Sequence, residues 1–194
     1  MVVGPSGAGK DSVISAWLRG QPRAARPHRV RRTITRPADV HEAHESIGAC
    51  AFAAAREAGA FAFHWQAHGL DYGIRHGELA ALAAGGWVVM NGSREHLAQL
   101  RAVAPQARVV EIDAPAALRQ RRLHDRSRED AEGRAARIVR EAPPAQADLR
   151  IVNDGSLDEA VATLERWWNA IVEDRATGDC GISTPGAGVV ASET

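Results

Sequence analysis

Apolar residues in this chain occur in short runs that are separated by longer amphipathic segments. Residues 1–3 form the first run, and residues 87–90, 108–112 and 149–152 form three more. Turn-forming Gly, Asn, Asp or Pro residues flank these runs. Short, mostly apolar runs bounded by such residues are typical of buried strands. The pattern therefore predicts four buried strands.

Amphipathic segments lie between these runs. Residues 13–18, 78–84, 94–103 and 115–126 have the composition of helices, and a final helix follows residue 156. One face of the final helix is expected to carry Leu157, Val161, Leu164, Trp168 and Ile171. Strands that alternate with helices predict an α/β fold with a parallel sheet covered on both faces. Ligands of such sheets bind beyond the carboxyl ends of the strands.

The segment 29–74 interrupts this alternation and predicts an inserted β-rich subdomain. β-branched residues at alternate positions, ended by Pro37, are typical of a strand, and a polar, histidine-rich stretch is typical of a loop. The expected order is a strand over 28–37, a loop over 38–48, a helix over 49–59 and a strand over 61–68, followed over 69–74 by a turn into another short strand.

Two segments in the second half of the chain differ in composition. Residues 127–141 are charged and expected to be helical, whereas 175–194 are rich in Gly, Ser, Thr, Pro and Ala with few apolar anchors. The latter composition predicts a disordered tail. Of the 194 residues, 1–174 are therefore expected to form one domain.

Charge and cysteine content exclude several classes of function. Lys plus Arg and Asp plus Glu both number 24, so the formal net charge is zero. Bulk charge thus gives no support for binding to nucleic acid or to a membrane surface. No apolar run approaches the length of a membrane span, and Cys50 and Cys180 form neither a metal-ligand spacing nor a disulfide framework. We expect a cytoplasmic protein with a small-molecule partner, and its oligomeric state stays open.

A glycine-rich motif connects the first apolar run to the first helix. Its spacing is G-x-x-x-x-G-K, which is the phosphate-binding loop. Glycines allow successive N–H groups to point at phosphate oxygens, and the following helix presents unpaired N–H groups to the same anion. The residues expected to bind the donor phosphates are Gly4, Pro5, Ser6, Gly7, Ala8, Gly9, Lys10, Asp11 and Ser12.

One position departs from the motif. The residue after the lysine is ordinarily Ser or Thr, whose hydroxyl meets Mg²⁺, but here it is Asp11, followed by Ser12. A carboxylate is also a good ligand for Mg²⁺, although without a metal it would repel phosphates. Asp11 and Ser12 are both metal-ligand candidates. The alternative is an ordinary glycine turn in which Asp11 is a favourable charge at a helix N-terminus.

Several motifs resemble the guanylate kinase superfamily, in order along the chain to about residue 174. The matching segments are Gly4-Pro5-Ser6-Gly7-Ala8-Gly9-Lys10, Thr33-Ile34-Thr35-Arg36-Pro37, His68-Gly69-Leu70-Asp71-Tyr72-Gly73, Arg126-Ser127-Arg128-Glu129 and Ile151-Val152-Asn153-Asp154. The resemblance implies a P-loop nucleoside monophosphate kinase-like fold with three layers. It also implies an inserted acceptor-binding subdomain, a helical lid over about 126–141, and the use of ATP and Mg²⁺.

Within that superfamily the chain is more similar to the ribose 1,5-bisphosphate phosphokinase family. The segments that carry this resemblance are Gly9-Lys10-Asp11-Ser12, Ile34-Thr35-Arg36-Pro37, His64-Trp65-Gln66-Ala67-His68-Gly69-Leu70 and Val89-Met90-Asn91-Gly92-Ser93-Arg94. Asp11 is expected in this family. The resemblance implies ATP-dependent phosphorylation of ribose 1,5-bisphosphate to 5-phosphoribosyl 1-diphosphate, a step in phosphonate breakdown.

Two differences from guanylate kinases point the same way. His64 stands where those enzymes have a carboxylate that reads guanine, and Asn91-Gly92-Ser93 replaces a second acidic stretch. Without these carboxylates the hydrogen-bond donors of a bound guanine would stay unpaired, and the selectivity of the site for guanine would fall roughly a thousandfold. We therefore expect His64, Asn91 and Ser93 to contact a different acceptor.

The superfamily also implies roles for several cations. Lys10, Arg126, Arg128 and Arg137 would surround the transferring phosphoryl group, and Arg36 and Tyr72 would contact the acceptor's phosphate. An ionised acceptor phosphate needs no general base. The alternatives are a solvated helix face for the arginine-rich run, a buried aromatic in a turn for Tyr72 and a surface residue for Arg36. For the whole protein they are a guanylate-type kinase and a non-catalytic binding module.

Overall fold

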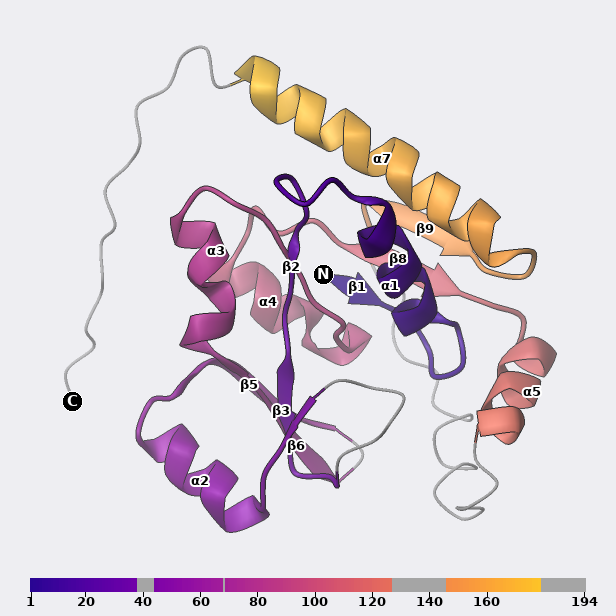
Figure 1. Cartoon of the computed structure of the whole chain (residues 1–194). Coiled ribbons are helices and arrows are strands. Elements are labelled where there is room, and N and C mark those ends of the chain that lie inside the picture. Colours follow the sequence, from indigo (N-terminus) through magenta and orange to yellow (C-terminus); the bar gives the residue numbers. More distant parts are fainter. Residues whose placement is uncertain (38–43, 68, 127–145, 179–194) are drawn as a thin grey trace.

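The computed structural model describes residues 1–37, 44–67, 69–126 and 146–178 (Figure 1). It contains the predicted parallel sheet in two hydrogen-bonded parts. The first part has the order β1-β8-β9, and the second pairs β2 with β7. The bounds are β1 Val2–Val3, β2 His28–Arg29, β7 Val88–Val89, β8 Val110–Asp113 and β9 Leu149–Val152.

Backbone hydrogen bonds beside β1 join the two parts. The N–H of Val2 donates to the carbonyl of Met90 at 2.8 Å, and the N–H of Gly92 donates to the carbonyl of Val2 at 2.9 Å. Val2 and Asn91 form a parallel bridge there. The parallel strands therefore follow the order β2-β7-β1-β8-β9, and the loops that follow β1 and β7 leave at the same edge of the sheet.

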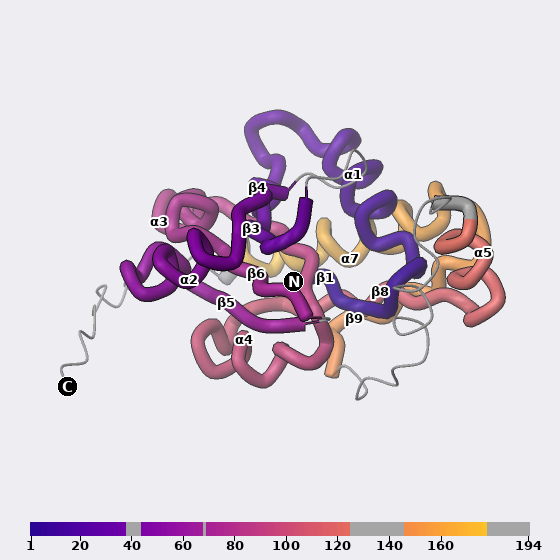
Figure 2. The backbone as a smooth tube through the Cα atoms, turned by 90° about the horizontal axis from the view of Figure 1, so that it is seen from below, coloured from indigo at the N-terminus to yellow at the C-terminus, as the bar shows by residue number. Residues whose placement is uncertain are grey.

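Helices cover both faces of this sheet. Val2 packs with α1 (Lys10–Gly20) and α7 (Leu157–Gly178), whereas its neighbour Val3 packs with Leu97 of α4 (Leu97–Val103). Successive strand residues point to opposite faces, so the two valines separate the two cores. Figure 2 shows α1 and α4 on opposite sides of β1 and β8. The expected three-layer α/β fold is confirmed.

Tryptophan packing joins α1 to α7. The rings of Trp17 and Trp168 meet edge to face with centroids 5.3 Å apart, and Trp87 contacts Trp168 in the same way at 4.9 Å. Leu164 is buried beside them, but Leu157 is 38% exposed, contrary to the expected apolar stripe. Leu157 is the first residue of α7, and the buried positions begin one turn later at Ala160.

The inserted β-rich subdomain is also present. Its strands are β3 (Arg32–Ile34), β4 (His44–Ser46), β5 (Phe61–Ala67) and β6 (Leu70–Arg75), in the order β4-β3-β6-β5. The loop predicted over 38–48 is wrong at β4, which pairs in parallel with β3. The residues of β4 are polar, and their pairing with β3 is not visible in the hydrophobic pattern of the sequence. Residues 38–43 and 68 lie outside the described residues.

The two faces of the inserted sheet pack against different neighbours. One face carries Trp65 and Tyr72, which join Met90 and Leu100 of the main body in one cluster. On the other face, Phe61 stacks on Phe52 of α2 (Ala49–Glu57), with centroids 4.6 Å apart. The first face therefore fixes the subdomain against the end of β7.

The remaining elements differ from the predictions mainly at their ends. The predicted helices over 78–84 and 94–103 each begin as a 3₁₀ turn, η1 (His76–Leu79) before α3 (Ala80–Ala83), and η2 (Arg94–His96) before α4. Helix α5 spans Ala116–Arg126. The predicted lid from residue 127 lies outside the described residues, as does the tail from 179, and α7 continues to Gly178.

Glu45 on β4 provides a test of how this polar strand is held. Its carboxylate accepts hydrogen bonds from Arg75 Nε at 2.7 Å and from the hydroxyl of Thr33 at 2.6 Å. These bonds, the arginine's above all, hold the pKa of Glu45 below its ordinary value of 4.5. The stabilisation is therefore present above pH 4.5 and is lost as the pH falls through the lowered pKa of the folded state.

We expect Glu45→Gln to lower the free energy of unfolding by about 1 kcal/mol at pH 7, because the ion pair is partly exposed. Urea unfolding at pH 7 and at an acid pH below 4.5 measures the difference, which should become smaller as the pH falls through the lowered pKa of Glu45. Glu57→Gln, at the exposed end of α2, is the matched control and should change little at either pH. A difference for Glu45→Gln that persists unchanged in acid would contradict the assignment.

Candidate active site

The glycine-rich loop between β1 and α1 adopts a backbone that requires glycine. Gly4, Gly7 and Gly9 have φ angles of 141°, 80° and 87°. A Cβ on Gly4 would lie 1.9 Å from the carbonyl oxygen of Ile112, and one on Gly9 would lie 2.4 Å from Asn153 Nδ2. The loop is therefore pressed against β8 and the end of β9, and α1 begins directly after it.

Lys10 places its ammonium group over the start of this loop. Nζ donates to the carbonyl oxygens of Gly4 at 2.8 Å and Pro5 at 2.9 Å. The side chain thus folds back from α1, and its charge lies beside the loop amides and the positive end of the helix dipole. This arrangement concentrates positive potential where donor phosphates would bind.

Asn153 holds the loop from the end of β9, a role that the sequence motifs did not indicate. Its Nδ2 donates to the carbonyl of Ala8 at 2.8 Å, and both residues are buried. Arg122 of α5 donates through Nη1 to the carbonyl of Asn153 at 3.2 Å. The position of Asn153 directly after β9 was the available signal, because such positions face the ligand edge of a parallel sheet.

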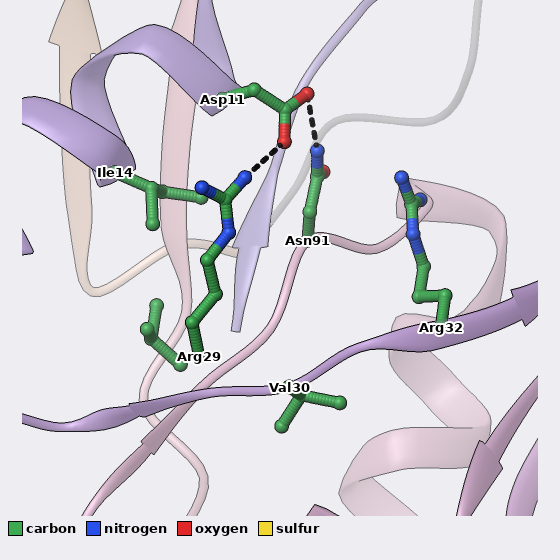
Figure 3. Close-up of a pocket in the computed structure, with 7 residues that line it drawn as sticks. Asp11, Ile14, Arg29, Val30, Arg32 and Asn91 are labelled. Atoms are coloured by element: carbon green, nitrogen blue, oxygen red, sulfur yellow. Dashed lines mark hydrogen bonds and ion pairs between the residues drawn. The ribbon is translucent and has the colours of Figure 1, made fainter. Parts of the chain in front are cut away.

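Asp11 is bound by two side chains that lie at the end of β2 and just after β7. Arg29 Nη2 donates to its Oδ1 at 2.8 Å, and Asn91 Nδ2 donates to its Oδ2 at 3.0 Å (Figure 3). Arg29 also donates through Nη1 to the hydroxyl of Ser15 at 2.6 Å. The guanidinium neutralises the carboxylate, which explains how a negative charge is accommodated beside a phosphate-binding loop.

The residues at the start of α1 suit Mg²⁺ in their chemistry. Asp11 and Ser12 carry the hard oxygen atoms that Mg²⁺ prefers, and protein Mg²⁺ sites commonly combine one or two such ligands with phosphates and water. Both oxygens of Asp11 already accept hydrogen bonds, so only their remaining lone pairs can face a metal. Within the described residues no group of three or more His, Cys, Asp or Glu forms a metal site by itself.

A pocket lies beside Asp11, between the start of α1 and the ends of β2 and β7. Its lining residues are Asp11, Ile14, Arg29, Val30, Arg32, Val89 and Asn91. Arg29 and Arg32 were not among the predicted site residues. Arg29 ends β2 and Arg32 begins β3, so the chain passes from one sheet to the other between them.

The pocket has a positive character on the side of the inserted subdomain. Burial lowers the pKa of the Arg32 guanidinium, the Asp11 carboxylate opposes this change, and the nearby guanidinium groups of Arg36 and Arg29 add to it. The Arg32 guanidinium lies over the ring of Tyr72, 5.8 Å from its centroid. Tyr72 lies in β6, not in a turn, and stacks on Trp65 with centroids 5.1 Å apart. The structure thus brings Arg36 and Tyr72 together with Arg32.

The other predicted site residues are more scattered. His64 lies opposite Gly73 in the sheet and is exposed, and strand alternation places it on the face opposite Trp65 and Tyr72. The structure therefore does not bring His64 to the pocket. Ser93 lies directly before η2, two positions after Asn91, and it does not line the pocket.

The predicted arginines of the lid are placed only in part. Arg126 is the last residue of α5, whereas Arg128 and Arg137 lie outside the described residues. Among the helices in the described part of the chain, none combines the length and apolar character needed to cross a bilayer.

The chain is similar in sequence to several kinases. It is 42% identical over 167 residues to ribose 1,5-bisphosphate phosphokinase PhnN from Methylobacterium radiotolerans, covering 84% of this chain and 93% of that protein. It is 44% identical over 172 residues to the enzyme of the same name from Burkholderia pseudomallei, with the same two coverages of 84% and 93%. No family model matches the chain.

Two further comparisons concern a fusion protein and the fold. A bifunctional ribose 1,5-bisphosphokinase-thymidine phosphorylase from Azorhizobium caulinodans is 42% identical over 176 residues, which are 90% of this chain and 25% of that longer protein. The crystal structure of guanylate kinase from Anaplasma phagocytophilum superposes with a TM-score of 0.62 and 17% sequence identity, covering 88% of this chain and 85% of that one. The second match confirms the guanylate kinase-like fold.

Proposed function

The chain belongs to the ribose 1,5-bisphosphate phosphokinase family, and we propose that it transfers the γ-phosphoryl group of ATP to ribose 1,5-bisphosphate. The products are 5-phospho-α-D-ribose 1-diphosphate and ADP. The observation that carries the proposal is the set of charged side chains around the small pocket beside the phosphate loop. Its lining combines Arg29 and Arg32 with Asp11, a carboxylate that is already paired and therefore poorly placed to read a base.

The acceptor's chemistry fits a site without a general base. An ionised oxygen of the acceptor's C1 phosphate forms a new bond to the γ-phosphorus of ATP. At the same time the bond from that phosphorus to the leaving group, ADP, breaks. The oxygen carries no proton at neutral pH, so no side chain has to remove one. Catalysis then consists of positioning and of stabilising negative charge.

Some residues of the site bind the phosphate donor, and others bind the acceptor. Lys10, the amides of the loop and the N-terminus of α1 hold the donor phosphates. Arg32 and Arg36 hold the acceptor's phosphates, and the ring of Tyr72 lies under the guanidinium group of Arg32. Arginine suits this role because its fork-shaped donors match phosphate oxygens. Arg126, Arg128 and Arg137 complete the charge around the transferring group in this proposal.

A divalent metal completes the donor side of the site. Mg²⁺, when bound, neutralises charge on the donor phosphates. Ser12 and the remaining lone pairs of Asp11 are the groups of this chain that would hold it, directly or through water. In the same proposal the partner is a small phosphorylated sugar and the site of action is the cytoplasm, with no nucleic acid or membrane partner.

An ADP-release assay with ATP and Mg²⁺ tests this function, using ribose 1,5-bisphosphate and GMP as competing acceptors. We expect release with the sugar bisphosphate and none above the acceptor-free background with GMP. Release with GMP alone would replace the proposal by a guanylate-type kinase. Release with neither, from folded protein that binds ATP, would overturn both activities and favour a binding module.

A further inference from the structure

The amide of Asn91 has a defined orientation. Its nearest partner is the carboxylate of Asp11, which can only accept hydrogen bonds, so the amide must present its NH₂ group there. Arg29 fixes the carboxylate in turn from the opposite side, and Ser15 fixes Arg29. The oxygen Oδ1 of Asn91 is therefore turned away from Asp11. Figure 3 shows Asn91 between Asp11 and Arg32 in the pocket wall.

This oxygen is an acceptor without a donor. Oδ1 of Asn91 is buried, and it has no hydrogen-bond partner among the residues that the structure describes. Buried polar atoms in folded proteins nearly always have a partner, and exceptions commonly mark a functional site. Asn91 lines the pocket, so a ligand that occupies the pocket and reaches the shielded Oδ1 can supply the missing hydrogen.

The chemistry of the acceptor limits what that hydrogen can be. Ionised phosphate groups accept hydrogen bonds and donate none at neutral pH, and the ring oxygen of a sugar also only accepts. The hydroxyl groups of the sugar ring are therefore the donors that a ribose bisphosphate offers. A carboxamide oxygen is a suitable acceptor for such a hydroxyl.

We propose that Oδ1 of Asn91 accepts a hydrogen bond from a ring hydroxyl of the acceptor sugar, and that Asp11 is the positioning residue that turns this oxygen into the pocket. The inference rests on the proposed function and deepens it by assigning sugar-hydroxyl recognition to Asn91. Asp11 then acts on the acceptor through Asn91, and this role requires no metal. If Asp11 acts only as a metal ligand, its replacement should not change acceptor binding in the absence of metal.

The variant Asp11→Ser separates the two roles of Asp11. Serine restores the hydroxyl that phosphate loops ordinarily present to Mg²⁺, but its short side chain removes the carboxylate that holds Asn91 and Arg29. A metal-only role predicts unchanged binding of the acceptor when EDTA is present and nucleotide is absent. The positioning role predicts acceptor binding that is about tenfold weaker under the same conditions.

Isothermal titration calorimetry in EDTA gives the direct test. We expect wild-type protein to bind ribose 1,5-bisphosphate about tenfold to a hundredfold more tightly than its 2-deoxy or its 3-deoxy analogue. Asn91→Leu should weaken binding of the parent sugar by a similar factor and abolish the discrimination between parent and analogue. Asn169→Leu, at an exposed position of α7, is the matched control and should bind as the wild type does.

The outcomes separate this inference from the proposed function. If wild-type protein binds the sugar bisphosphate and both deoxy analogues equally, the hydroxyl contact is overturned without using any variant. If Asp11→Ser binds the acceptor as tightly as wild type, the positioning role is overturned and the metal role is favoured. If wild-type protein binds and phosphorylates no sugar bisphosphate, the proposed function fails, and this inference fails with it.

Discussion

Replacing Lys10 by Met is expected to lower kcat/KM for ribose 1,5-bisphosphate by about a thousandfold, which corresponds to about 4 kcal/mol of transition-state stabilisation. Methionine keeps an unbranched side chain but removes the ammonium group that lies over Gly4 and Pro5. That charge adjoins the phosphates whose negative charge is redistributed during transfer. Steady-state kinetics of ADP release measures the change.

Two further variants make the Lys10 experiment specific. Arg19→Met removes one positive charge from an exposed position at the other end of α1 and should leave kcat/KM unchanged. Lys10→Arg keeps the charge with a larger head group and should recover only part of the activity. Turnover by Lys10→Met within a few-fold of wild type would remove Lys10 from the catalytic group.

The second large effect is expected on stability. Gly4→Ala should lower the free energy of unfolding by about 4 kcal/mol, because two penalties coincide at this position. The φ angle of 141° strains any residue with a side chain, and the new Cβ would meet the carbonyl oxygen of Ile112 at 1.9 Å. That oxygen belongs to the backbone of β8, so it cannot move aside without disturbing the sheet.

Gly20→Ala is the matched control for Gly4→Ala. Gly20 is the last residue of α1, has no atom within 4 Å of an added Cβ, and is not among the positive-φ glycines. Alanine there should be neutral or stabilising by up to about 1 kcal/mol. Urea unfolding followed by tryptophan fluorescence compares both variants with wild type. Equal stability of Gly4→Ala and Gly20→Ala would show that the loop adjusts at little cost.

The parts of the site that lie close together in the sequence were predictable. The spacing from Gly4 to Lys10, placed between an apolar run and an amphipathic helix, specifies a phosphate-binding loop through local backbone requirements alone. The alternation of apolar runs and helices likewise predicted the parallel sheet and its two covering layers. In both cases the interactions that determine the structure are local or periodic, so they can be predicted from the sequence pattern.

The parts that depend on distant partners were not predictable from pattern. Period-two alternation places Arg29 and Arg32 on opposite faces of one strand, but the chain changes sheets between them, and both line the same pocket. Strand β4 is polar, and its carboxylate Glu45 is held by Thr33 of β3 and Arg75 of β6. Asn153 reaches the loop from a position 145 residues away from Ala8.

Asp11 shows most clearly that contacts between distant residues are not visible in the sequence pattern. The sequence showed a carboxylate where a hydroxyl is usual, and its chemistry indicated a metal ligand. The structure adds a guanidinium from a residue 18 positions away and an amide from one 80 positions away. The charge of Asp11 is thereby balanced by a partner that no local pattern specifies.

The contacts of Lys10 have a practical consequence for labelling chemistry. Lys10 is the only lysine in the chain, so an amine-acylating reagent finds one ε-amino group, and that group lies in the phosphate loop. The rate of acylation at this amine then reports the accessibility of the loop by mass spectrometry, with no need for turnover. A nucleotide that occupies the loop protects the amine, so one labelling curve per nucleotide ranks donors by affinity.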